Sequence, residues 1–477
     1  MFGRKPQQIR VRFAPSPTGP LHIGGAKTML FNWLFAKNKG GVLILRIEDT
    51  DVTRSQKKYE KDIMDGLLWL GLDWDEGPYR QSERIDIYEQ YLKKLLEENK
   101  AYYCFCTKEE LEAERQTLLT QGLAPKYSGK CRGLTIREIK QKIRKRLPSV
   151  VRLKVSDEEI SFTDLIRGKI VFNTNLLGDI VIARNLRSPL YNFTAVVDDA
   201  LMAISHIIRG DEHLSNTPKQ ILLIRALGFN EPDYAHLPLI LAPDRSKLSK
   251  RHLVTSLNDY KKTGYLPEAM INFLALLGWH PIEDRETITK EELIREFSLE
   301  RVQKAGAVFN LQKLDWFNAY YIRQLEDEEL TKRLIPFVKP LDWAKNQEFL
   351  TKVAAVEKIR LKKLSDFSNL ASFFFKLPAY QKNLLIWREQ TSSQTILILK
   401  EAENIFSSIL DLGFKKETLE QQFLPLIQKE GRGEVLWPLR VALSGQEASP
   451  GPFEIAEVLG KEEVIKRVRI AIRKLSF

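Results

Sequence analysis

The first fifty residues contain two strand-like segments on either side of a helix-like one. In IRVRF (9–13), apolar and basic residues alternate with the period of two that is typical of a strand. Apolar residues then recur at helical spacing over 26–38, and Gly40 and Gly41 are expected to end this helix. VLILRIED (42–49) is almost continuously apolar, as strands are in a parallel sheet that is covered on both faces. The succession predicts a right-handed βαβ unit that opens a doubly wound α/β domain.

The loop between the first strand and the helix, APSPTGPLHIGG (14–25), is rich in proline and glycine. In doubly wound sheets, ligands bind at the carboxyl ends of the strands, and the N–H groups at a helix N-terminus suit phosphate. Glycines let a ligand approach the backbone, and prolines keep the loop open. The loop therefore predicts an anion site that includes His22 and Gly24. A proline-rich turn with a surface histidine is the alternative interpretation.

The α/β pattern stops at about residue 86 and resumes near residue 196. Residues 86–195 are irregular and contain all three cysteines. In the helix expected after Asn216, Thr217 is predicted to be the N-cap and Gln220 to complete a capping box. After about residue 325 the chain reads as successive amphipathic helices with lysine-rich faces. We therefore predict a Rossmann-type α/β domain that is split by an α+β insertion and followed by an all-α part.

Composition and charge limit the classes of protein to which the chain can belong. With 477 residues, 43% hydrophobic and 29% charged, the chain is expected to form several domains of an ordinary globular protein. No apolar stretch reaches the ~18 residues of a membrane span, and no apolar segment follows the basic N-terminus as in a secretory signal. Three cysteines, an odd number, favour a reducing compartment, so we expect the cytoplasm. A net charge of +12 indicates either a solubility charge or a polyanionic partner.

A second basic segment, DRSKLSKRH (244–252), follows the apolar run LPLILAP. Its lysines, Lys247 and Lys250, could reach a triphosphate that lies on the first helix. Cations placed in this way neutralise the charge that develops during transfer at phosphorus. A basic surface turn is the alternative interpretation of the same residues.

Several segments occur in the order in which bacterial-type glutamyl-tRNA synthetases, which are class I aminoacyl-tRNA synthetases, contain them. They are APSPTGPLHIGG (14–25), RIEDTD (46–51), DEGPYRQS (75–82), VVDD (196–199) and KLSKR (247–251), with PLRVALSG and PGPFEIAEVLGKE within 438–462. The chain therefore resembles this family, and HIGG and KLSKR correspond to the HIGH and KMSKS signatures of the class. The glutaminyl relatives generally read PPEPNG where this chain reads APSPTG, so the resemblance favours glutamate as the amino acid.

The resemblance implies ATP-dependent activation of L-glutamate to glutamyl-adenylate and transfer to the 3′-terminal ribose of tRNA(Glu), with Mg²⁺ on the ATP. It implies catalytic roles for His22, Lys247 and Lys250, and contacts to ATP from these residues and from Gly24, Glu212 and His213. The residues implied to bind glutamate are Arg12, Ala14, Ser16, Glu48, Tyr191 and Arg209. Two arginines suit the two carboxylates of glutamate, and one acid suits its ammonium group. Surface salt bridges and a capping acid are the alternatives.

The same resemblance assigns a role to each part of the chain. It implies a catalytic domain from 1–85 and 196–245, an acceptor-stem-binding insertion at 86–195, a stem-contact domain at 246–325 and a helical anticodon-binding domain at 326–477. A tRNA partner would account for the positive net charge. Arg360, in VEKIRLKKL, is a candidate anticodon-reading residue, with a solvated helix face as the alternative. The chain length fits a monomer, and whether glutamine-accepting tRNA is also charged stays open.

The three cysteines form a candidate metal site within the insertion. Cys104 and Cys106 form a C-x-C pair, and Cys131 follows at a spacing that suits zinc. Many bacterial relatives have a histidine where this chain has Gly133. The related glutamyl-queuosine synthetases use C-x-C…Y-x₃-C, which Tyr127 and Cys131 match. Zinc with Tyr127 as the fourth ligand and three ordinary buried cysteines both remain open.

Three other functions are compatible with parts of the sequence. A glutamyl-queuosine-tRNA synthetase would resemble the catalytic half and end near residue 300, whereas this chain continues with helices. A non-catalytic tRNA-binding paralogue would be expected to lack His22, Lys247 or Lys250. A small-molecule nucleotidylyltransferase would not need appendages that match the size of a tRNA.

Overall fold

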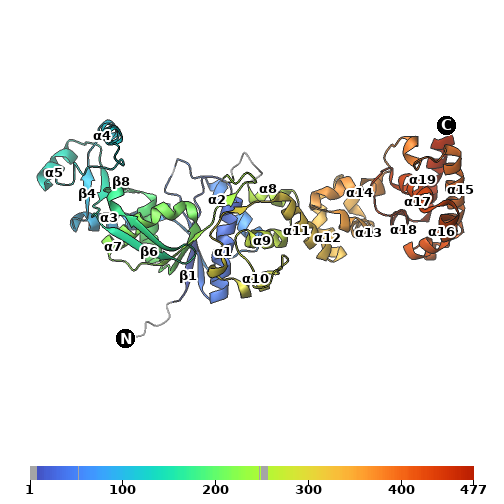
Figure 1. Cartoon of the computed structure of the whole chain (residues 1–477), viewed down its shortest axis with the longest axis horizontal. Helices are drawn as coiled ribbons and strands as arrows, with labels where there is room; N and C mark the ends of the chain where they lie inside the picture. Colours follow the sequence, from blue (N-terminus) through green and yellow to red (C-terminus); the bar gives the residue numbers. More distant parts are fainter. Residues whose placement is uncertain (1–7, 52, 247, 249–255, 477) are drawn as a thin grey trace. The chain divides into compact units, whose positions relative to one another are not determined.

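The structure is a computed structural model and describes residues 8–51, 53–246, 248 and 256–476. Two compact units make up the chain: Met1–Lys261 with Met270–Leu311, and Lys262–Ala269 with Gln312–Phe477. Figure 1 shows the chain as a ribbon that is coloured from its N-terminus to its C-terminus. Within the described ranges, no helix is long and apolar enough to cross a bilayer.

The expected βαβ unit is present at the start of the first unit. Strand β1 (Arg10–Phe13) is parallel to β2 (Val42–Ile47), and α1 (Ile23–Lys39) connects them. Helix α1 begins three residues earlier than the apolar pattern indicated, because the Nδ1 atom of His22 accepts a hydrogen bond from the Gly25 N–H and caps the helix. Gly40 ends α1 in the left-handed conformation, as expected.

Further parallel strands continue the α/β domain in two neighbouring sheets, β1-β2-β3 and β10-β11-β6-β7. Strand β3 (Glu76–Arg80) pairs in parallel with β2, and β10 (His206–Gly210) pairs in parallel with β11 (Asp233–Leu237). The start of β1 is joined to the residue before β10, because the Ser205 N–H donates to the Arg10 carbonyl at 2.9 Å. The helices beside these strands are α2 (Lys57–Trp69), α3 (Ile85–Glu97), α6 (Tyr191–Leu201) and α7 (Thr217–Leu227). The predicted α/β class is thus confirmed.

The residues between α3 and α6 form an α+β insertion with two separate strand groups. One is a four-stranded antiparallel sheet of β4 (Ala101–Cys104), β5 (Val150–Leu153), β8 (Ile180–Asn185) and β9 (Ser188–Pro189). Helices α4 (Lys108–Thr120) and α5 (Ile136–Arg144) lie beside it (Figure 1). The other is the hairpin of β6 (Glu159–Asp164) and β7 (Gly168–Asn173), in which β6 pairs with β11. The insertion therefore also extends the sheet of β10 and β11.

The capping box predicted for α7 is wrong. The N-cap of α7 is Asn216, and Thr217 is its first helical residue. The Thr217 and Gln220 side chains accept hydrogen bonds from the Arg209 guanidinium instead, at 2.8 and 2.7 Å. The local pattern was correct for a helix start, but both side chains are used to hold an arginine of the neighbouring strand.

A smaller part of the first unit follows the main sheet. Strand β12 (Ile240–Leu241) pairs in parallel with β13 (Ala307–Val308). Helices α8 (Leu257–Lys262), α9 (Pro267–Leu276) and α10 (Lys290–Glu296) lie between these strands in sequence. Residues 262–269 belong to the second unit, so the segment 246–325 contributes to both units.

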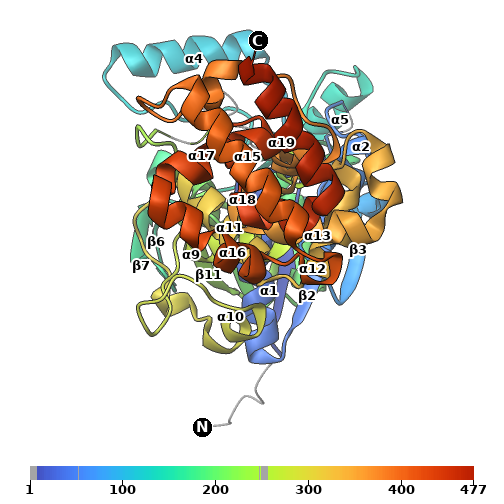
Figure 2. The same ribbon diagram turned by 90° about the vertical axis from the view of Figure 1, so that its right-hand side faces the viewer.

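The second unit consists of helices over the residues that the structure describes. They are α11 (Leu311–Gln324), α12 (Asp327–Leu334), α13 (Gln347–Glu357), α14 (Phe367–Phe375), α15 (Ser392–Ser408), α16 (Lys416–Glu430), α17 (Arg432–Ser444), α18 (Pro452–Leu459) and α19 (Lys461–Ser476). Figure 2 shows α15, α17 and α19 packed together. Arg467 of α19 is buried and donates to the carbonyls of Phe373 and Leu443, which ties α19 to α14 and α17.

Candidate active site

A cleft of about 620 Å³ opens where β1, β2 and β10 end and α1 begins. This is the position at which doubly wound sheets bind ligands. The predicted site residues of the described chain, apart from the cysteine cluster and Arg360, line it: Arg12, Ala14, Ser16, His22, Gly24, Glu48, Tyr191, Arg209, Glu212 and His213. The structure thus brings together residues that are nearly two hundred positions apart in the sequence. Lys247 and Lys250 lie outside the described residues.

One side of the cleft is held by a buried network of charges. Arg12 Nε donates to Asp199 at 3.1 Å, and Arg46 donates both to Asp199 at 2.7 Å and to Glu48 at 3.1 Å. Burial would raise the pKa of Asp199, but the charges of Arg12 and Arg46 hold that pKa below its ordinary value. Asp199, on α6, therefore connects β1 to β2 through their arginines.

The network leaves part of Arg12 and Glu48 available to a ligand. Within the described chain, the Nε atom of Arg12 has a protein partner and its two Nη groups have none. Glu48 is 7% exposed, and burial raises its pKa despite the nearby charges of Arg46 and Arg12. A cationic ligand group beside Glu48 would favour its ionised form.

Arg209 is fixed on the other side of the cleft by three side chains. Its Nε donates to His236 Nε2 at 3.1 Å, and its Nη groups donate to Gln220 and Thr217. His236 Nε2 must therefore accept, so Nδ1 carries the proton and donates to Asp164 at 2.6 Å. Burial lowers the pKa of His236, which is consistent with this neutral form. Asp164 belongs to β6, so the insertion contributes to the orientation of Arg209.

Tyr191 and His213 contact each other at the edge of the same cleft. The Tyr191 hydroxyl lies 3.2 Å from His213 Nδ1. Burial, together with the charge of Arg209, lowers the pKa of His213 to about 4, so its imidazole is neutral at pH 7. Glu212 lies on the 3-10 helix η3 (Asp211–Asn216), where its carboxylate covers Gly210.

A second cavity, of about 530 Å³, shares His22, Gly24 and Glu212 with the cleft. Its other walls are mostly apolar and come from α1, from residues 237–240 and from Leu248. They include Ile23, Leu237, Leu239, Ile240 and Leu248. A flat apolar group next to a helix N-terminus is the kind of ligand that such a cavity accommodates.

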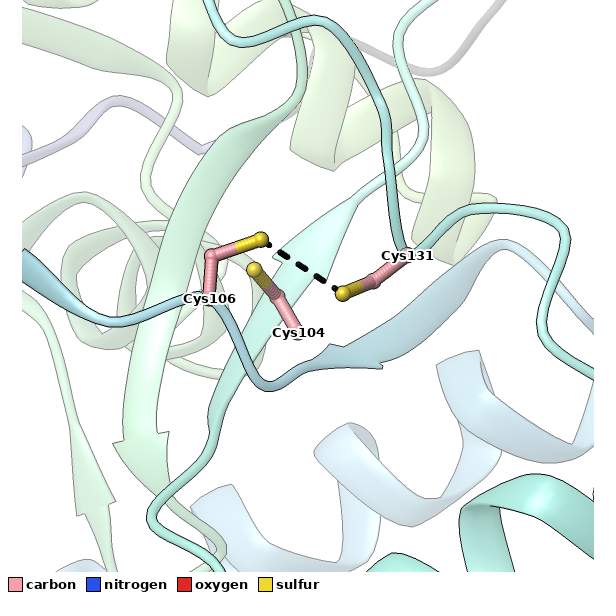
Figure 3. Close-up of side chains that lie close together, drawn as sticks. All are labelled: Cys104, Cys106 and Cys131. Atoms are coloured by element: carbon pink, nitrogen blue, oxygen red, sulfur yellow. Dashed lines mark hydrogen bonds between the residues drawn. The ribbon is translucent and has the colours of Figure 1, made fainter. Parts of the chain in front are cut away.

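The predicted cysteine cluster is present in the insertion (Figure 3). The Sγ atoms of Cys104, Cys106 and Cys131 all lie within 4.8 Å of one another, and those of Cys106 and Cys131 are 3.6 Å apart. The Tyr127 hydroxyl lies 3.4 Å from Cys104 Sγ and 3.5 Å from Cys106 Sγ. Tetrahedral zinc with Zn–S bonds of ~2.3 Å would separate its sulfurs by about 3.8 Å. The donor set and its spacing therefore fit zinc.

Arg360 lies in the second unit, where its side chain has partners within the protein. Its Nη1 donates to both carboxylate oxygens of Glu357, at 3.0 and 2.8 Å, and its Nη2 donates to the Ala448 carbonyl. Glu357 is buried. The arrangement shows how Arg360 is held, and its contact with tRNA stays a prediction.

Sequence reasoning did not assign Arg46, Asp199, His236 or Asp164 to the site. RIEDTD and VVDD, which contain Arg46 and Asp199, were recognised as motifs, but nothing local indicated that the two residues pair. His236 and Asp164 carried no motif signal, because their role depends on a contact between the insertion and the main sheet.

Comparison with known proteins agrees with this geometry. Residues 8–316 match the family of tRNA synthetases class I (E and Q), catalytic domain, and residues 329–472 match an anticodon binding domain. The chain is 44% identical over 471 residues to glutamate–tRNA ligase 2 of Thermoanaerobacter pseudethanolicus, covering 98% of both chains. It is 45% identical over 483 residues to the glutamate–tRNA ligase of Carboxydothermus hydrogenoformans, covering 96% of this chain and 99% of the relative.

A solved structure is similar over almost the whole chain. The crystal structure of a glutamate tRNA ligase from Elizabethkingia meningosepticum in complex with its amino acid superimposes with a TM-score of 0.88 at 36% identity. The match covers 98% of this chain and 100% of that one. The chain therefore belongs to the glutamate–tRNA ligases, a family of class I aminoacyl-tRNA synthetases.

Proposed function

We propose that the protein activates L-glutamate with ATP and transfers the glutamyl group to the 3′-terminal ribose of tRNA(Glu). The observation that carries the proposal is the cleft in which Arg12, Arg209 and Glu48 face one space at the N-terminus of α1. Two cations and one anion match the two carboxylates and the ammonium of glutamate. The names of the relatives that match over nearly the full length support the same reaction.

In this proposal, glutamate is bound by charge and shape together. Arg12 pairs with the side-chain carboxylate through its Nη groups, which have no hydrogen-bond partner among the described residues, and Arg209 pairs with the α-carboxylate. Glu48 binds the ammonium group, which keeps Glu48 ionised despite its burial. Three other residues implied to bind glutamate, Ala14, Ser16 and Tyr191, also line the cleft and limit the size of the pocket.

ATP is proposed to occupy the adjoining cavity, with its phosphates at the N-terminus of α1. His22 and Gly24 lie at this terminus, and Glu212 and His213 lie where the adenosine would pass from the cavity to the cleft. Lys247 and Lys250 are assigned to the phosphates, and Mg²⁺ would be bound through phosphate oxygens. The base would fill the apolar part of the cavity.

The chemical step needs positioning more than proton transfer. The α-carboxylate of glutamate is already a nucleophile, and it attacks the α-phosphorus of ATP while the bond to the pyrophosphate leaving group breaks. The ribose hydroxyl of tRNA then attacks the acyl carbon and AMP leaves. The roles of His22, Lys247 and Lys250 are to bind and neutralise the phosphates as charge develops.

The tRNA is proposed to contact the parts of the chain outside the cleft. We assign the acceptor end to residues 86–195, the inner stem to 246–325 and the anticodon to 326–477, with Arg360 as a candidate contact. The catalytic domain comprises 1–85 and 196–245. The net charge of +12 supports binding of a polyanion. We further propose a cytoplasmic monomer that charges glutamate-accepting tRNA, and glutamine-accepting tRNA is the second substrate to test.

Zinc is proposed to be bound by Cys104, Cys106, Tyr127 and Cys131. Four protein ligands leave no open position, so zinc here would hold the chain together and would not act on a substrate. It would connect the end of β4 to the loop that precedes α5. The acceptor end of the tRNA would then meet a rigid surface.

Charging of purified tRNA with radiolabelled glutamate tests the proposed reaction. We expect charging that requires ATP and an intact 3′-terminal adenosine, and glutamate-dependent exchange of pyrophosphate into ATP when tRNA is present. Periodate-oxidised tRNA is the control, because it lacks the ribose hydroxyls that would accept the glutamyl group. Charging that survives oxidation would indicate modification of a base, and no charging of any tRNA would contradict the proposal.

A further inference from the structure

Lys27 is a buried cation that the proposed binding of glutamate does not use. It lies on the second turn of α1 and is 2% exposed. Its Nζ donates to the Pro238 carbonyl at 2.9 Å, and its side chain lines the second cavity together with His22, Gly24 and Glu212. The side chain therefore connects α1 to the wall that follows β11.

The end of the Lys27 side chain is confined between three backbone segments. Gly278, with φ at +120°, would place a Cβ 3.1 Å from Lys27 Nζ and 3.3 Å from Pro238 Cγ. Glycine at this position therefore leaves the room that the ammonium occupies. The Phe31 ring, one turn further along α1, lies 5.5 Å from Nζ. This packing fixes the ammonium in one place.

An ammonium in this position is costly for the fold. Among the described residues, the Pro238 carbonyl is its hydrogen-bond acceptor, and Glu212 is the charged group that faces it. Burial lowers the pKa of Lys27 to about 7, and the attraction of Glu212 opposes this only in part. An apolar side chain of the same length would avoid the desolvation cost. Stability therefore does not explain why a cation is present here.

The surroundings of Lys27 indicate a role in binding the nucleotide. Pro238 lies between Leu237 and Leu239, which form the apolar wall of the cavity. Glu212 lies where the cavity meets the cleft. A cation that holds the Pro238 carbonyl and attracts the Glu212 carboxylate sets both the width of the cavity and the orientation of its acid.

We propose that Lys27 is a positioning residue for ATP, which acts by holding Pro238 and Glu212 in the geometry that accepts adenosine. The proposal rests on the assignment of the second cavity to ATP in the proposed function. Lys27 need not touch the nucleotide. Its effect is therefore expected on the affinity for ATP and not on the affinity for glutamate.

The test compares Lys27→Met, Lys27→Arg and, as a matched control, Lys39→Met at the exposed end of α1. The dissociation constant of ATP is measured by equilibrium dialysis, and the KM values for ATP and glutamate are measured by tRNA charging. We expect Lys27→Met to raise both ATP constants by about tenfold or more, as loss of a hydrogen bond to a charged group does. Its KM for glutamate and the constants of Lys39→Met should change by less than about twofold.

Two further measurements separate positioning from a structural role. The melting temperature of Lys27→Met should stay close to that of the parent, because the desolvation cost of a buried charge is removed while the Pro238 carbonyl loses its donor. Arginine keeps its charge at every accessible pH, so the KM for ATP of Lys27→Arg should not change through loss of a proton from this side chain. Between pH 6 and pH 8.5, the ratio of the KM for ATP of the parent to that of Lys27→Arg should rise, because only lysine loses its proton near pH 7.

Several outcomes would overturn the inference. Folded Lys27→Met with unchanged constants for ATP would show that the cation has no part in binding. If Lys27→Met does not fold, the KM for ATP of the parent is divided by that of Lys27→Arg at each pH. A ratio that does not change with pH would also show that the cation has no part in binding. Failure of the proposed function looks different, because the parent itself would then neither bind ATP nor charge tRNA.

Discussion

Arg12 on β1 donates a hydrogen bond to Asp199 on α6, and the carboxylate that receives it also receives one from Arg46 on β2. A single acid thus holds two buried arginines that would otherwise repel each other. The arginine that we assign to the glutamate side chain is aimed by a residue that need not touch the substrate.

Replacing Asp199 by asparagine should therefore weaken glutamate binding. The variant leaves two buried cations with one fewer anion, which should lower the free energy of unfolding by about 3 kcal/mol. We expect the KM for glutamate in tRNA charging to rise at least about tenfold, with a smaller change in the KM for ATP. Asp157→Asn, on an exposed loop, is the control. Equal glutamate constants in the parent and in folded Asp199→Asn would show that Asp199 does not position Arg12.

Arg209→Lys tests whether glutamate binding needs the planar guanidinium of Arg209. Three hydrogen bonds hold the guanidinium, and an ammonium can neither reach all three partners nor bind a carboxylate with two parallel bonds. We expect a rise of about tenfold or more in the KM for glutamate. Arg225→Lys, on the exposed side of α7, should behave like the parent. If both variants have the KM of the parent, Arg209 does not bind the substrate.

Gly24→Ala should disturb the helix N-terminus that we assign to phosphate. The new Cβ would lie 3.1 Å from His22 Nδ1, the atom that accepts the Gly25 N–H. Displacement of the imidazole should cost about 1 kcal/mol of helix capping and slow adenylate formation. Rapid-quench measurement of glutamyl-adenylate gives the rate. Gly133→Ala, in the insertion, is the control because no atom lies within 4 Å of the added Cβ and the residue lines neither cavity. A parent-like rate for Gly24→Ala would remove His22 and Gly24 from the proposed ATP site.

Lys250→Ala should slow the formation of glutamyl-adenylate without weakening the binding of glutamate. We expect nearly unchanged glutamate binding, because Lys250 is assigned to the phosphates of ATP and not to glutamate. Adenylate formation should become slower by orders of magnitude, as for loss of a cation at a transferring phosphate. Lys261→Ala is a control at a solvent-exposed lysine in the same region. Equal activation rates in parent and Lys250→Ala would contradict the assigned role.

Zinc should be present in protein that is purified without chelators, at about one ion per chain. Tyr127→Phe removes one proposed ligand and should raise the zinc dissociation constant at least about tenfold, measured by competition with a coloured chelator. Tyr103→Phe, which removes a hydroxyl that is not a proposed ligand from the same strand as Cys104, is the control. Protein that contains no zinc and whose melting temperature does not change on adding zinc would leave the cluster as three buried thiols.

The sequence predicted the parts of the molecule that are encoded by short-range patterns. The alternation of IRVRF and the glycines after α1 were sufficient for the start of the α/β domain, and the resemblance to a known family supplied the residues of the cleft. It failed at α7, because Thr217 and Gln220 gain more from the buried guanidinium of Arg209 than from a local capping box. The tertiary contact overrode the local preference.

The partners of the site residues could not be predicted for a related reason. Asp199 on α6 pairs with Arg46 on β2, and Asp164 reaches His236 because the hairpin of β6 and β7 joins β11. Each of these contacts depends on how distant segments fold together. A single sequence contains no direct signal for such pairs.

The contact between Asp164 and His236 also limits which segments of the chain can be removed or exchanged without disturbing the site. Residues 86–195 look like a module that could be removed or exchanged between relatives. Removal would leave His236 without the acceptor for its Nδ1 proton, and the imidazole could then turn away from Arg209. A transplant that keeps β6 and β7 with the recipient and exchanges only the sheet of β4, β5, β8 and β9 respects this dependence. The boundary for exchanging parts of this enzyme therefore runs through the middle of the insertion and not along its edges.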